Sequence, residues 1–426
     1  MKRKFLSILV ALCMALTMLP VQMMAAEPAY DDVAGHWAES SITRWSNHGI
    51  VRGSDGTFDP NGELTCAQLA TILARLLNLS SAPSANFSDN DPTAWYADAI
   101  NRCAAAGILN GNGDGTVTPN APISRERAIV MLGRALGIEP QANPDLTKYT
   151  DAAKVAPYAQ GMVAAMIEAG IVGGVGDNQI APQDEINRAS TVTILDRAIS
   201  TYANKDGETI SVSDTNGITL VVADNVTLSG NVDTLLVPAD NVDVTLTGSA
   251  NTSSIAVTGD SSTVTVKNSD VDSARVSGDG SKVVLNNTDV KTVTASGENA
   301  AVEATGTTKI NTVTITEDAK GATVSAGSGT TINTVENDAS DATVTGSGAV
   351  KSVSSSEDVT IETKNTEVKN AGDSQITVTD KNGKDSTVSS GSNTTVSNTT
   401  TSSGGSSSSS SSHSHSYTEK ITKEAT

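Results

Sequence analysis

A unit of about sixty residues occurs three times between Tyr30 and Ser200, and this repetition constrains the fold more than any other feature of the 426-residue chain. Each copy has an aromatic residue, an aliphatic residue five positions later, a glycine twelve positions after the aromatic, a proline turn and a polar residue that can begin a helix. One unit buries too little apolar surface to be stable alone, so three stacked units with a shared helical core are predicted. The matched positions are Trp37, Ile42, Gly49, Pro60 and Thr65 in the first copy, Trp95, Ile100, Gly107, Pro119 and Ser124 in the second, and Tyr158, Val163, Gly170, Pro182 and Asn187 in the third.

The spacing of apolar residues predicts a helix, a Gly-rich loop and a second helix in each copy. The first helix is expected to place its aromatic residue and the following apolar residues on one buried face. The second helix follows the proline turn. The apolar positions are Trp37, Ile42 and Trp45, then Leu69, Ile72, Leu73, Leu76 and Leu77 in the first copy, Ile129, Leu132 and Leu136 in the second, and Tyr158, Met162, Val163, Met166 and Ile167 in the third.

The second helix of each copy begins with a residue whose side chain can accept hydrogen bonds from the free N–H groups of the first turn: Thr65, Ser124 or Asn187. In the first copy Gln68 completes a capping box. The residue after the cap is Arg125 in the second copy and Arg188 in the third. Because a helix N-terminus is already partly positive, an arginine there indicates a nearby anion.

Two interpretations of these arginines remain open. Backbone N–H groups, the helix dipole and a guanidinium together can bind a carboxylate or a phosphate. Alternatively, each arginine forms a salt bridge to an Asp or Glu of the neighbouring copy and only holds the repeats together.

The N-terminus has the pattern of a secretory signal peptide. Three basic residues follow Met1, an apolar run extends over residues 5–19, and small residues stand at Ala25 and Ala26, after which cleavage is expected. A membrane-spanning helix is the alternative, but the apolar run is short and polar sequence follows it. The mature chain is therefore expected to be secreted, with no membrane contact after cleavage.

The charge balance excludes one class of partner. The chain has 48 acidic and 28 basic residues, a net charge of −20. Nucleic-acid binding requires clustered Lys and Arg, so this composition argues against a nucleic-acid partner and fits a solvated extracellular protein. Cys66 and Cys103 remain after processing; buried free thiols are expected, with a disulfide as the alternative.

After Ala203 the composition changes to Val, Thr, Ser, Asn, Asp and Gly, and apolar residues alternate in pairs such as Val264/Val266 and Val283/Leu285, which is typical of short strands. A longer period of 19 or 20 residues is superimposed. It predicts a parallel β-solenoid, with three short sides to each turn and a β-sandwich as the rival fold. The period appears in Val237, Val257, Val276, Ala295 and Ile315, in Val266, Leu285 and Ala304, and in Val271, Val290 and Ile310.

From about Ser386 the chain is rich in Ser, Thr, Asn and Gly, with seven consecutive serines at residues 406–412. This composition predicts a flexible, disordered linker. The last residues resemble the opening of a further module that is truncated. The predicted organisation is a signal peptide (1–26), repeats (30–80, 86–140 and 146–202), a β-solenoid (207–385), a linker (386–416) and the possible start of another module (417–426).

The three copies resemble the surface-layer homology (SLH) repeat family. The resemblance rests on DDVAGHWAESSI, on the loops GIVRG and GILNG, on DGTFDPNGELT, and on the helix starts TCAQ, SRER and NRAS. It implies a three-repeat helical bundle that anchors a secreted protein by binding an acidic, often pyruvylated, secondary cell-wall polysaccharide in grooves between repeats. It also implies a location at the cell wall, where self-association in a surface layer is a further possible partner interaction.

The resemblance assigns polysaccharide contacts to Arg125 and Arg188, with Trp37, Trp95 and Tyr158 as the family aromatics. We expect these aromatics mainly to pack in the core. The first copy departs from the family because Cys66 replaces the arginine, so its groove is expected to be weak or inactive, leaving two working grooves.

A wall-anchored carbohydrate-active enzyme is the alternative function. This alternative, of the polysaccharide lyase or hydrolase type, places catalysis in the solenoid or in a missing C-terminal domain. Between Ala203 and Ser412 there is no His and no aromatic residue, and the acids are scattered, so catalysis in the solenoid is not expected. No cofactor or metal is expected either: Asn110, Asn112 and Asp114 resemble half of a calcium loop, but Ala121 stands where a bidentate carboxylate is required.

Overall fold

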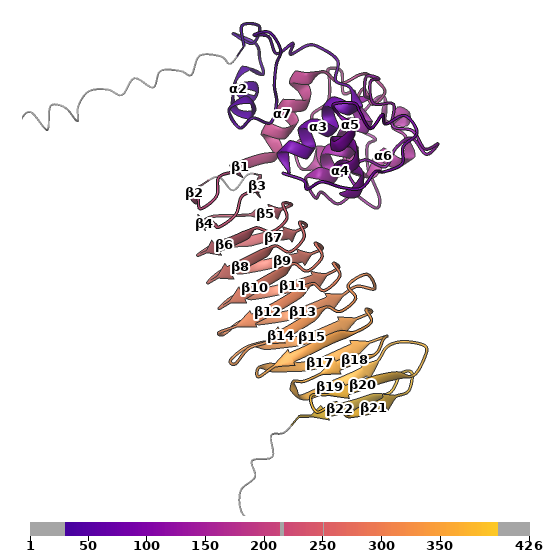
Figure 1. The fold of residues 1–426 in the computed structure, drawn as a ribbon, viewed down its shortest axis with the longest axis vertical. Helices are drawn as coiled ribbons and strands as arrows, with labels where there is room; N and C mark the ends of the chain where they lie inside the picture. Colours follow the sequence, from indigo (N-terminus) through magenta and orange to yellow (C-terminus); the bar gives the residue numbers. More distant parts are fainter. Residues whose placement is uncertain (1–29, 214–216, 250, 399–426) are drawn as a thin grey trace, which may run out of the picture.

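The computed structural model describes residues 30–213, 217–249 and 251–398, which form a helical N-terminal part and a long β-solenoid (Figure 1). The predicted signal peptide, the predicted module start at 417–426 and most of the predicted linker lie outside the described residues. No helix in the described part of the chain is both long and apolar enough to cross a lipid bilayer.

The helical part confirms a helix, a loop and a second helix in each repeat. The described residues contain six α-helices, two in each copy, and the short 3₁₀ helix Ala152–Lys154. The α-helices are α2 (Glu39–Asn47) and α3 (Cys66–Leu76) in the first copy, α4 (Ala97–Ala105) and α5 (Arg125–Ala135) in the second, and α6 (Pro157–Glu168) and α7 (Arg188–Ala198) in the third.

Helices from different copies pack in a closed circle. The first helix of each copy packs against the second helix of another copy: α4 against α3, α6 against α5 and α2 against α7. Arg44 and Ser41 of α2 both bond the Asp196 carboxylate of α7, at 2.9 and 2.8 Å, so the first and third copies are joined directly.

A ring of backbone hydrogen bonds marks the axis of this circle. The N–H of Leu64 donates to the carbonyl of Ile186 (3.0 Å), that of Ile186 to Ile123 (3.1 Å), and that of Ile123 to Leu64 (2.9 Å). All three side chains are buried. Each copy therefore donates one hydrogen bond and accepts one, which produces a pseudo-threefold arrangement.

The solenoid begins directly after α7 and consists of two sheets of eleven strands, each turn contributing one strand to each sheet (Figure 1). One sheet contains β1 (Ile199–Ala203), β3 (Ile218–Val221), β5 (Thr234–Val237), β7 (Thr252–Val257), β9 (Asp270–Val276), β11 (Asp289–Ala295), β13 (Lys309–Ile315), β15 (Thr331–Asn337), β17 (Ala349–Ser355), β19 (Lys364–Asn370) and β22 (Asn393–Ser397). The other contains β2 (Thr209–Val212), β4 (Val226–Gly230), β6 (Asp243–Thr247), β8 (Thr263–Lys267), β10 (Lys282–Asn286), β12 (Ala301–Thr305), β14 (Thr323–Ala326), β16 (Ala342–Gly346), β18 (Val359–Ile361), β20 (Ile376–Asp380) and β21 (Asp385–Val388).

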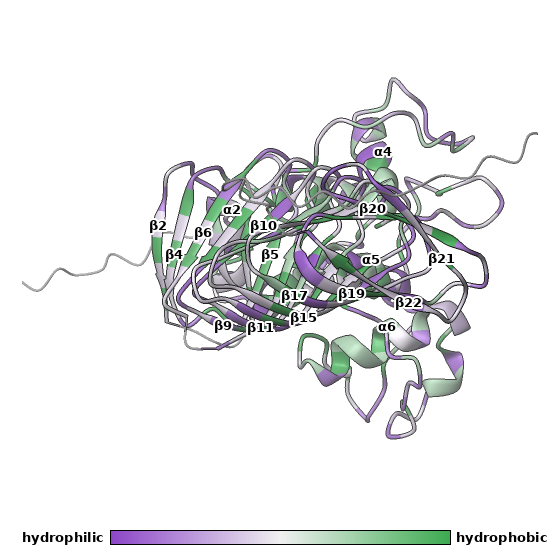
Figure 2. Cartoon of the chain, turned by 90° about the horizontal axis from the view of Figure 1, so that it is seen from below, coloured by the Kyte–Doolittle hydropathy of each residue, from purple (hydrophilic) through white to green (hydrophobic). Residues whose placement is uncertain are grey.

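The long sequence period is the stacking register of the parallel strands, which confirms the solenoid prediction. Val257 pairs with Val276, and Val276 with Ala295, in adjacent strands of one sheet. Val264 pairs with Val283 in the other sheet. These side chains are buried, so aliphatic residues stack on one another along the interior, and hydrophobic positions recur from strand to strand in Figure 2.

The prediction of three sides to each turn is wrong. Val271 and Val276, which belong to two different sequence series, lie on the same strand, β9. Both are buried although they are five residues apart, because the pairing with β11 passes over one residue after Val271 and the alternation changes phase there. A bend inside one strand therefore produces the spacing that suggested a third side.

The last turns differ from the rest. β19 pairs with β22, and β20 with β21, in antiparallel orientation. β21 and β22 extend into the stretch from residue 386 that was expected to be a linker, so the described fold continues to Asn398. Val388 and Val396 are buried there, which is how a segment so poor in apolar residues still adds to the core.

Cys66 and Cys103 are free and buried, as expected. The Cys103 thiol donates to the carbonyl oxygen of Ala70 at 3.3 Å, and burial raises the pKa of Cys103 to about 12. Cys66 and Cys103 therefore act as small packing residues in the helical core.

Candidate functional site

The two arginines at the helix starts reach across to the loop of another copy. Nε of Arg188 donates to the carbonyl oxygen of Phe58 and its Nη2 donates to that of Arg52, both at 2.9 Å. The guanidinium carbon also lies 4.3 Å from the centre of the Phe58 ring. An arginine of the third copy therefore fixes the loop of the first copy.

Arg125 makes the equivalent contacts one copy further on. Its Nε donates to the carbonyl of Ile180 (3.0 Å) and its Nη2 to that of Gly173 (2.8 Å), which are the third-copy counterparts of Phe58 and Arg52. Burial lowers the pKa of Arg125, and the neighbouring charge of Arg197 lowers it further. Among the described residues neither Arg125 nor Arg188 forms an ion pair, so both hold the repeats together through carbonyl groups and not through a salt bridge.

Cys66 occupies the third equivalent position, against the loop of the second copy. Its N–H donates to Ala121 (3.3 Å), as the N–H of Arg125 donates to Asp184 (2.8 Å). No guanidinium extends from residue 66, and Nη2 of Arg127 donates instead to Val117 at 3.1 Å. The groove that lacks an arginine is thus the one at the loop of the second copy. The sequence had predicted that the groove of the first copy would lack it.

The three family aromatics are exposed, and the expectation that they mainly pack in the core is wrong. The exposed fraction is 62% for Trp37, 65% for Trp95 and 59% for Tyr158. Other aromatic residues nearby fill the interior: Trp45 is fully buried and Tyr96 nearly so. Each exposed aromatic stands at or just before the start of a first helix, and two of them, Trp95 and Tyr158, line grooves.

Each copy has a second arginine that was not among the predicted site residues. Arg75, Arg134 and Arg197 each stand ten residues after the helix cap, in the second helix. This constant spacing was the signal that could have identified them. Arg75 lines a groove with Trp95, and Arg134 lines one with Tyr158.

Two grooves lie between repeats at these positions. Groove A has a volume of about 200 Å³ and groove B one of about 480 Å³. Groove A is lined by Arg52, Thr71, Arg75, Trp95 and Arg188, and groove B by Leu109, Asn110, Arg127, Arg134 and Tyr158. The repetition predicts a third groove at the equivalent position of the third copy, which we call groove C. Arg125 and Arg197 both lie close to Gly173 there, and the packing of α2 against α7 predicts Trp37 beside them.

The helix caps that set the direction of these arginines are only partly as predicted. Thr65 and Gln68 form the full capping box, with bonds of 3.2 and 3.0 Å, and the Asn187 side chain accepts from the N–H of Ser190 at 2.8 Å. Ser124 makes no side-chain cap bond. The start of α5 is nevertheless held, because the N–H groups of Arg125 and Glu126 donate to backbone carbonyls of the third copy.

An aspartate side chain supports each loop. The carboxylate of Asp32 accepts from the N–H groups of Phe58 and Asp59, and that of Asp151 from Ile180 and Ala181, all at 2.6–2.8 Å. Asp89 makes the same pair of bonds in the second copy. Burial raises the pKa of Asp32 and Asp151, but the N–H donors outweigh it and lower both below the ordinary value. These aspartates fix the carbonyl groups to which Arg125 and Arg188 are bonded.

The grooves combine guanidinium groups, exposed backbone and an aromatic ring. Such a set suits a ligand with a negative group beside a sugar ring, since a guanidinium bonds a carboxylate and an aromatic face packs against the apolar face of the sugar. The described residues contain no group of three or more His, Cys, Asp or Glu side chains that could hold a metal ion. Guanidinium groups and an aromatic ring are the groups that grooves A and B present to a ligand.

Comparison with known proteins identifies the family of the repeats. The model of the S-layer homology domain matches residues 29–70, 86–126 and 148–191. The amylopullulanase of Thermoanaerobacterium thermosulfurigenes is 31% identical over 40% of the chain and 9% of its own length, and the S-layer protein sap of Bacillus anthracis is 32% identical over 42% of the chain and 23% of its own length. The surface-layer 125 kDa protein of Lysinibacillus sphaericus is 25% identical over 55% of the chain and 20% of its own length.

The matches cover less than a quarter of each of these relatives, which include both surface-layer proteins and an enzyme. What they share with the chain is the repeats. Residues 29–70, 86–126 and 148–191 are therefore three S-layer homology domains, and the chain that carries them is a cell-surface protein.

Proposed function

We propose that the three repeats anchor the chain non-covalently to the cell wall by binding an acidic, pyruvylated secondary polysaccharide in the grooves between copies. The β-solenoid then projects from the wall as a stalk, adhesive or layer-forming region. The exposed aromatic beside an arginine in successive grooves is the observation that carries this proposal.

An anionic ligand fits the charge of the grooves. The chain as a whole has a net charge of −20, yet groove A contains Arg52, Arg75 and Arg188 and no acidic residue among those that line it. A local positive site on a negative protein favours a ligand with isolated negative groups over a densely charged polymer. A ketal-linked pyruvyl group supplies one carboxylate on a sugar, which matches this arrangement.

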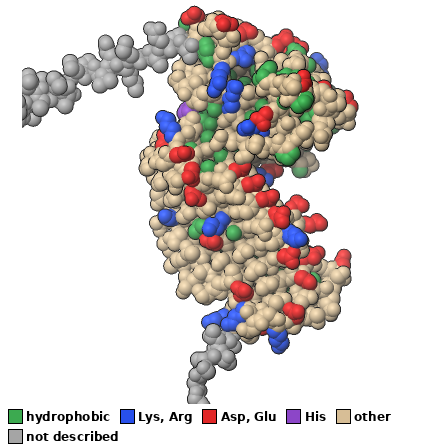
Figure 3. All heavy atoms as spheres, viewed as in Figure 1, with side chains coloured by type: hydrophobic (Ala, Val, Ile, Leu, Met, Phe, Trp, Pro, Cys, Tyr) green, Lys and Arg blue, Asp and Glu red, His purple; other side chains and the backbone are tan. Residues whose placement is uncertain are grey.

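We propose further that the chain is not an enzyme. The acids of the solenoid are distributed over its outer surface, as Figure 3 illustrates for one face. Many of them cap the backbone of the next turn: Asp260 bonds the N–H of Asp279, and Asp279 that of Glu298, both at 2.8 Å. Carboxylates occupied in this way support the fold and do not form the paired acid and base that glycan cleavage requires.

Co-sedimentation with isolated cell walls tests the anchoring proposal. The triple variant Arg75→Gln/Arg134→Gln/Arg197→Gln is expected to stay in the supernatant while the wild-type chain sediments. Its matched control is Lys291→Gln/Lys309→Gln/Lys351→Gln, which removes three positive charges from exposed positions of the solenoid and is expected to sediment normally.

Treating the walls with mild acid, which removes ketal-linked pyruvate, is expected to abolish sedimentation of the wild-type chain. Sedimentation of the triple variant at the wild-type level would contradict the proposal. Sedimentation of the wild-type chain that survives acid treatment would contradict the assignment of the pyruvyl group. Incubation of the chain with wall polysaccharide is expected to release no new reducing or unsaturated ends.

A further inference from the structure

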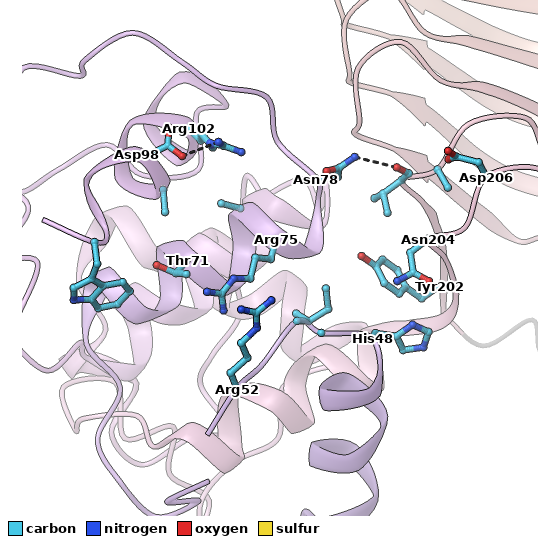
Figure 4. Close-up of a pocket in the computed structure, with 17 residues that line it drawn as sticks. His48, Arg52, Thr71, Arg75, Asn78, Asp98, Arg102, Tyr202, Asn204 and Asp206 are labelled. Carbon is cyan, nitrogen blue, oxygen red and sulfur yellow. Dashed lines mark hydrogen bonds and ion pairs between the residues drawn. The ribbon is translucent and has the colours of Figure 1, made fainter. Parts of the chain in front are cut away.

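A further cavity, in addition to the grooves between repeats, lies where the helical part meets the first turns of the solenoid (Figure 4). Its volume is about 500 Å³, in the range of small-ligand sites. One wall comes from the first two repeats, with Arg52 and Arg75 among its side chains, and the other from the solenoid, with Asn204 and Asp206. We call it the junction cavity.

Direct contacts fix the two walls of the junction cavity relative to each other. The hydroxyl of Tyr202 donates to the carbonyl of Leu76 at 2.9 Å, and the Asn78 amide donates to the carbonyl of Val222 at 3.3 Å. The rings of Tyr202 and His48 meet edge to face, with centres 5.0 Å apart. The cavity is thus a built feature of the joint between the two parts.

Positive charge is concentrated on the helical wall. Arg52 and Arg75 both line this wall, and their guanidinium groups lie next to each other in Figure 4. Burial lowers the pKa of Arg75, and the charge of Arg52 lowers it further. Among the described residues neither forms an ion pair, whereas Arg102 is paired with Asp98 at 2.7 Å. Burial also lowers the pKa of His48, which adds no charge at neutral pH. Two guanidiniums side by side without an acid favour an anion between them.

A neighbouring cavity along the same joint provides a contrast. It is lined by Arg134 and Arg275, but also by Asp260 and Asp279, and Arg275 is paired with Glu139 at 3.4 Å. Each of the two arginines there is matched by an aspartate, whereas the junction cavity has three arginines and two aspartates, one of which, Asp98, is paired with Arg102. The junction cavity is therefore the one of these two that suits an anionic ligand.

The junction cavity is continuous with groove A. Arg52, Thr71, Arg75 and Trp95 line both. Trp95, with 65% of its surface exposed, offers a ring to a sugar beside the two arginines. Beyond them Asn204 presents an amide. Asp206 presents a carboxylate whose Oδ1 accepts from the N–H of Asp224 at 2.9 Å, so its Oδ2 is the oxygen that can bond a hydroxyl group of a further sugar.

We infer that the junction cavity is an extension of groove A in which the solenoid binds the next sugar of the same acidic glycan chain, with the negative group held between Arg52 and Arg75. The inference rests on the proposed function. It makes the first turn of the solenoid part of the glycan site, and it distinguishes groove A from grooves B and C. A glycan segment longer than one repeating unit is thus expected to bind more tightly than a single unit, and only at groove A.

The experiment isolates groove A in the full chain. Arg134→Gln and Arg197→Gln serve as a background that weakens grooves B and C. The probes are fragments of the acidic polysaccharide released from isolated walls, in sizes of one repeating unit and of several, and binding is measured by calorimetry. In this background the longer fragments are expected to bind about tenfold more tightly than the single unit.

Asn204→Trp, which fills the cavity from the solenoid side, is expected to remove this tenfold preference and leave binding of the single unit unchanged. Asp206→Trp places an indole ring on the same wall of the cavity, at an exposed position, and is also expected to remove the preference. The matched control is Asn382→Trp, the same substitution in an exposed loop at the far end of the solenoid, and it is expected to keep the preference.

Equal affinity for long and short fragments in the background chain would overturn the inference, as would a preference that survives both tryptophan variants, or an absence of all binding in the background. The proposed function is judged separately by sedimentation of the wild-type chain. A wild-type chain that sediments together with any of these three results would remove the junction site alone. A wild-type chain that fails to sediment would remove both.

Discussion

The hydroxyl of Tyr202, in the first strand of the solenoid, donates a 2.9 Å hydrogen bond to the carbonyl oxygen of Leu76, at the end of α3. Burial raises the pKa of Tyr202, so the hydroxyl keeps its proton and remains a donor. The bond also satisfies one of the carbonyl groups that the end of a helix leaves without a partner. A buried hydrogen bond thus helps to join two parts of very different architecture.

Replacing Tyr202 with Phe removes this donor and leaves the Leu76 carbonyl buried without it. We expect the free energy of unfolding to fall by about 1 kcal/mol, measured by chemical denaturation. Tyr149→Phe is the matched control, because the hydroxyl of Tyr149 bonds no described residue, and its expected effect is close to zero. Equal stability of the two variants would show that the Tyr202 bond contributes nothing.

Trp95→Ala is expected to weaken wall binding about tenfold without changing the melting temperature, because the ring is 65% exposed and contributes little to the core. Trp45→Ala, at a fully buried position, is expected to destabilise the chain by about 3–5 kcal/mol. Thermal melts and sedimentation with walls check both. Strong destabilisation by Trp95→Ala would show instead that Trp95 mainly packs in the core.

Arg125→Ala is expected to reduce both stability and wall binding. It leaves the carbonyl groups of Ile180 and Gly173 without their donor at a position only 8% exposed, at a cost of about 1–3 kcal/mol. Arg75→Gln, at an exposed position, is expected to reduce binding alone. A thermal melt of Arg125→Ala that matches the wild type would exclude the supporting role of this arginine.

Cys66→Arg combined with Arg127→Gln is expected to strengthen wall binding through groove B. The new guanidinium can bond the carbonyls of Val117 and Asn110, as Arg125 and Arg188 bond their counterparts, once Arg127 no longer occupies Val117. The half-saturating amount of wall in a sedimentation series measures the effect. Arg127→Gln alone is the control, and it is expected to give no gain. An unchanged value for the double variant would mean that groove B does not bind the wall.

Acid is expected to destabilise the repeats through Asp32 and Asp151. The folded-state pKa of each lies below the ordinary 3.8, so their ionised forms stabilise the fold above about pH 4. This contribution is lost as the pH falls through the folded-state values. The melting temperature of the wild type is therefore expected to drop below pH 4, and that of Asp32→Asn/Asp151→Asn to drop less over the same interval.

Asp318→Asn/Asp373→Asn, at exposed positions of the solenoid, is the control for the acid series and is expected to follow the wild type. If the variant at Asp32 and Asp151 loses as much stability below pH 4 as the wild type, other carboxylates are responsible.

Much of the architecture follows from spacing alone. The positions of Trp37, Trp95 and Tyr158 predict three like units, and the 19–20 residue period equals the register in which Val257, Val276 and Ala295 pair between strands. These features are local or strictly periodic, so a single sequence contains them. The number of sides was not predictable in the same way, because a bend within β9 leaves the same apolar spacing as a corner.

The site was harder to predict from the sequence than the fold, because its residues come from different copies. Nothing near Arg188 indicates that its partners are the carbonyls of Phe58 and Arg52, more than 100 residues earlier in the chain. The exposure of Trp95 depends likewise on which helix covers which, and not on its own spacing. The constant position of Arg75 was visible, but a charged residue late in a helix is unremarkable until the groove beside it is known.

The ring of backbone bonds among Leu64, Ile123 and Ile186 means that the repeats do not form an open-ended array. A chain cut after its second repeat would be an arc with an unpaired donor at one end and an unpaired acceptor at the other, and each would be left in apolar surroundings. Repeats of this kind are therefore expected to be gained or lost in sets of three, so that the smallest heritable unit of wall attachment is the closed ring.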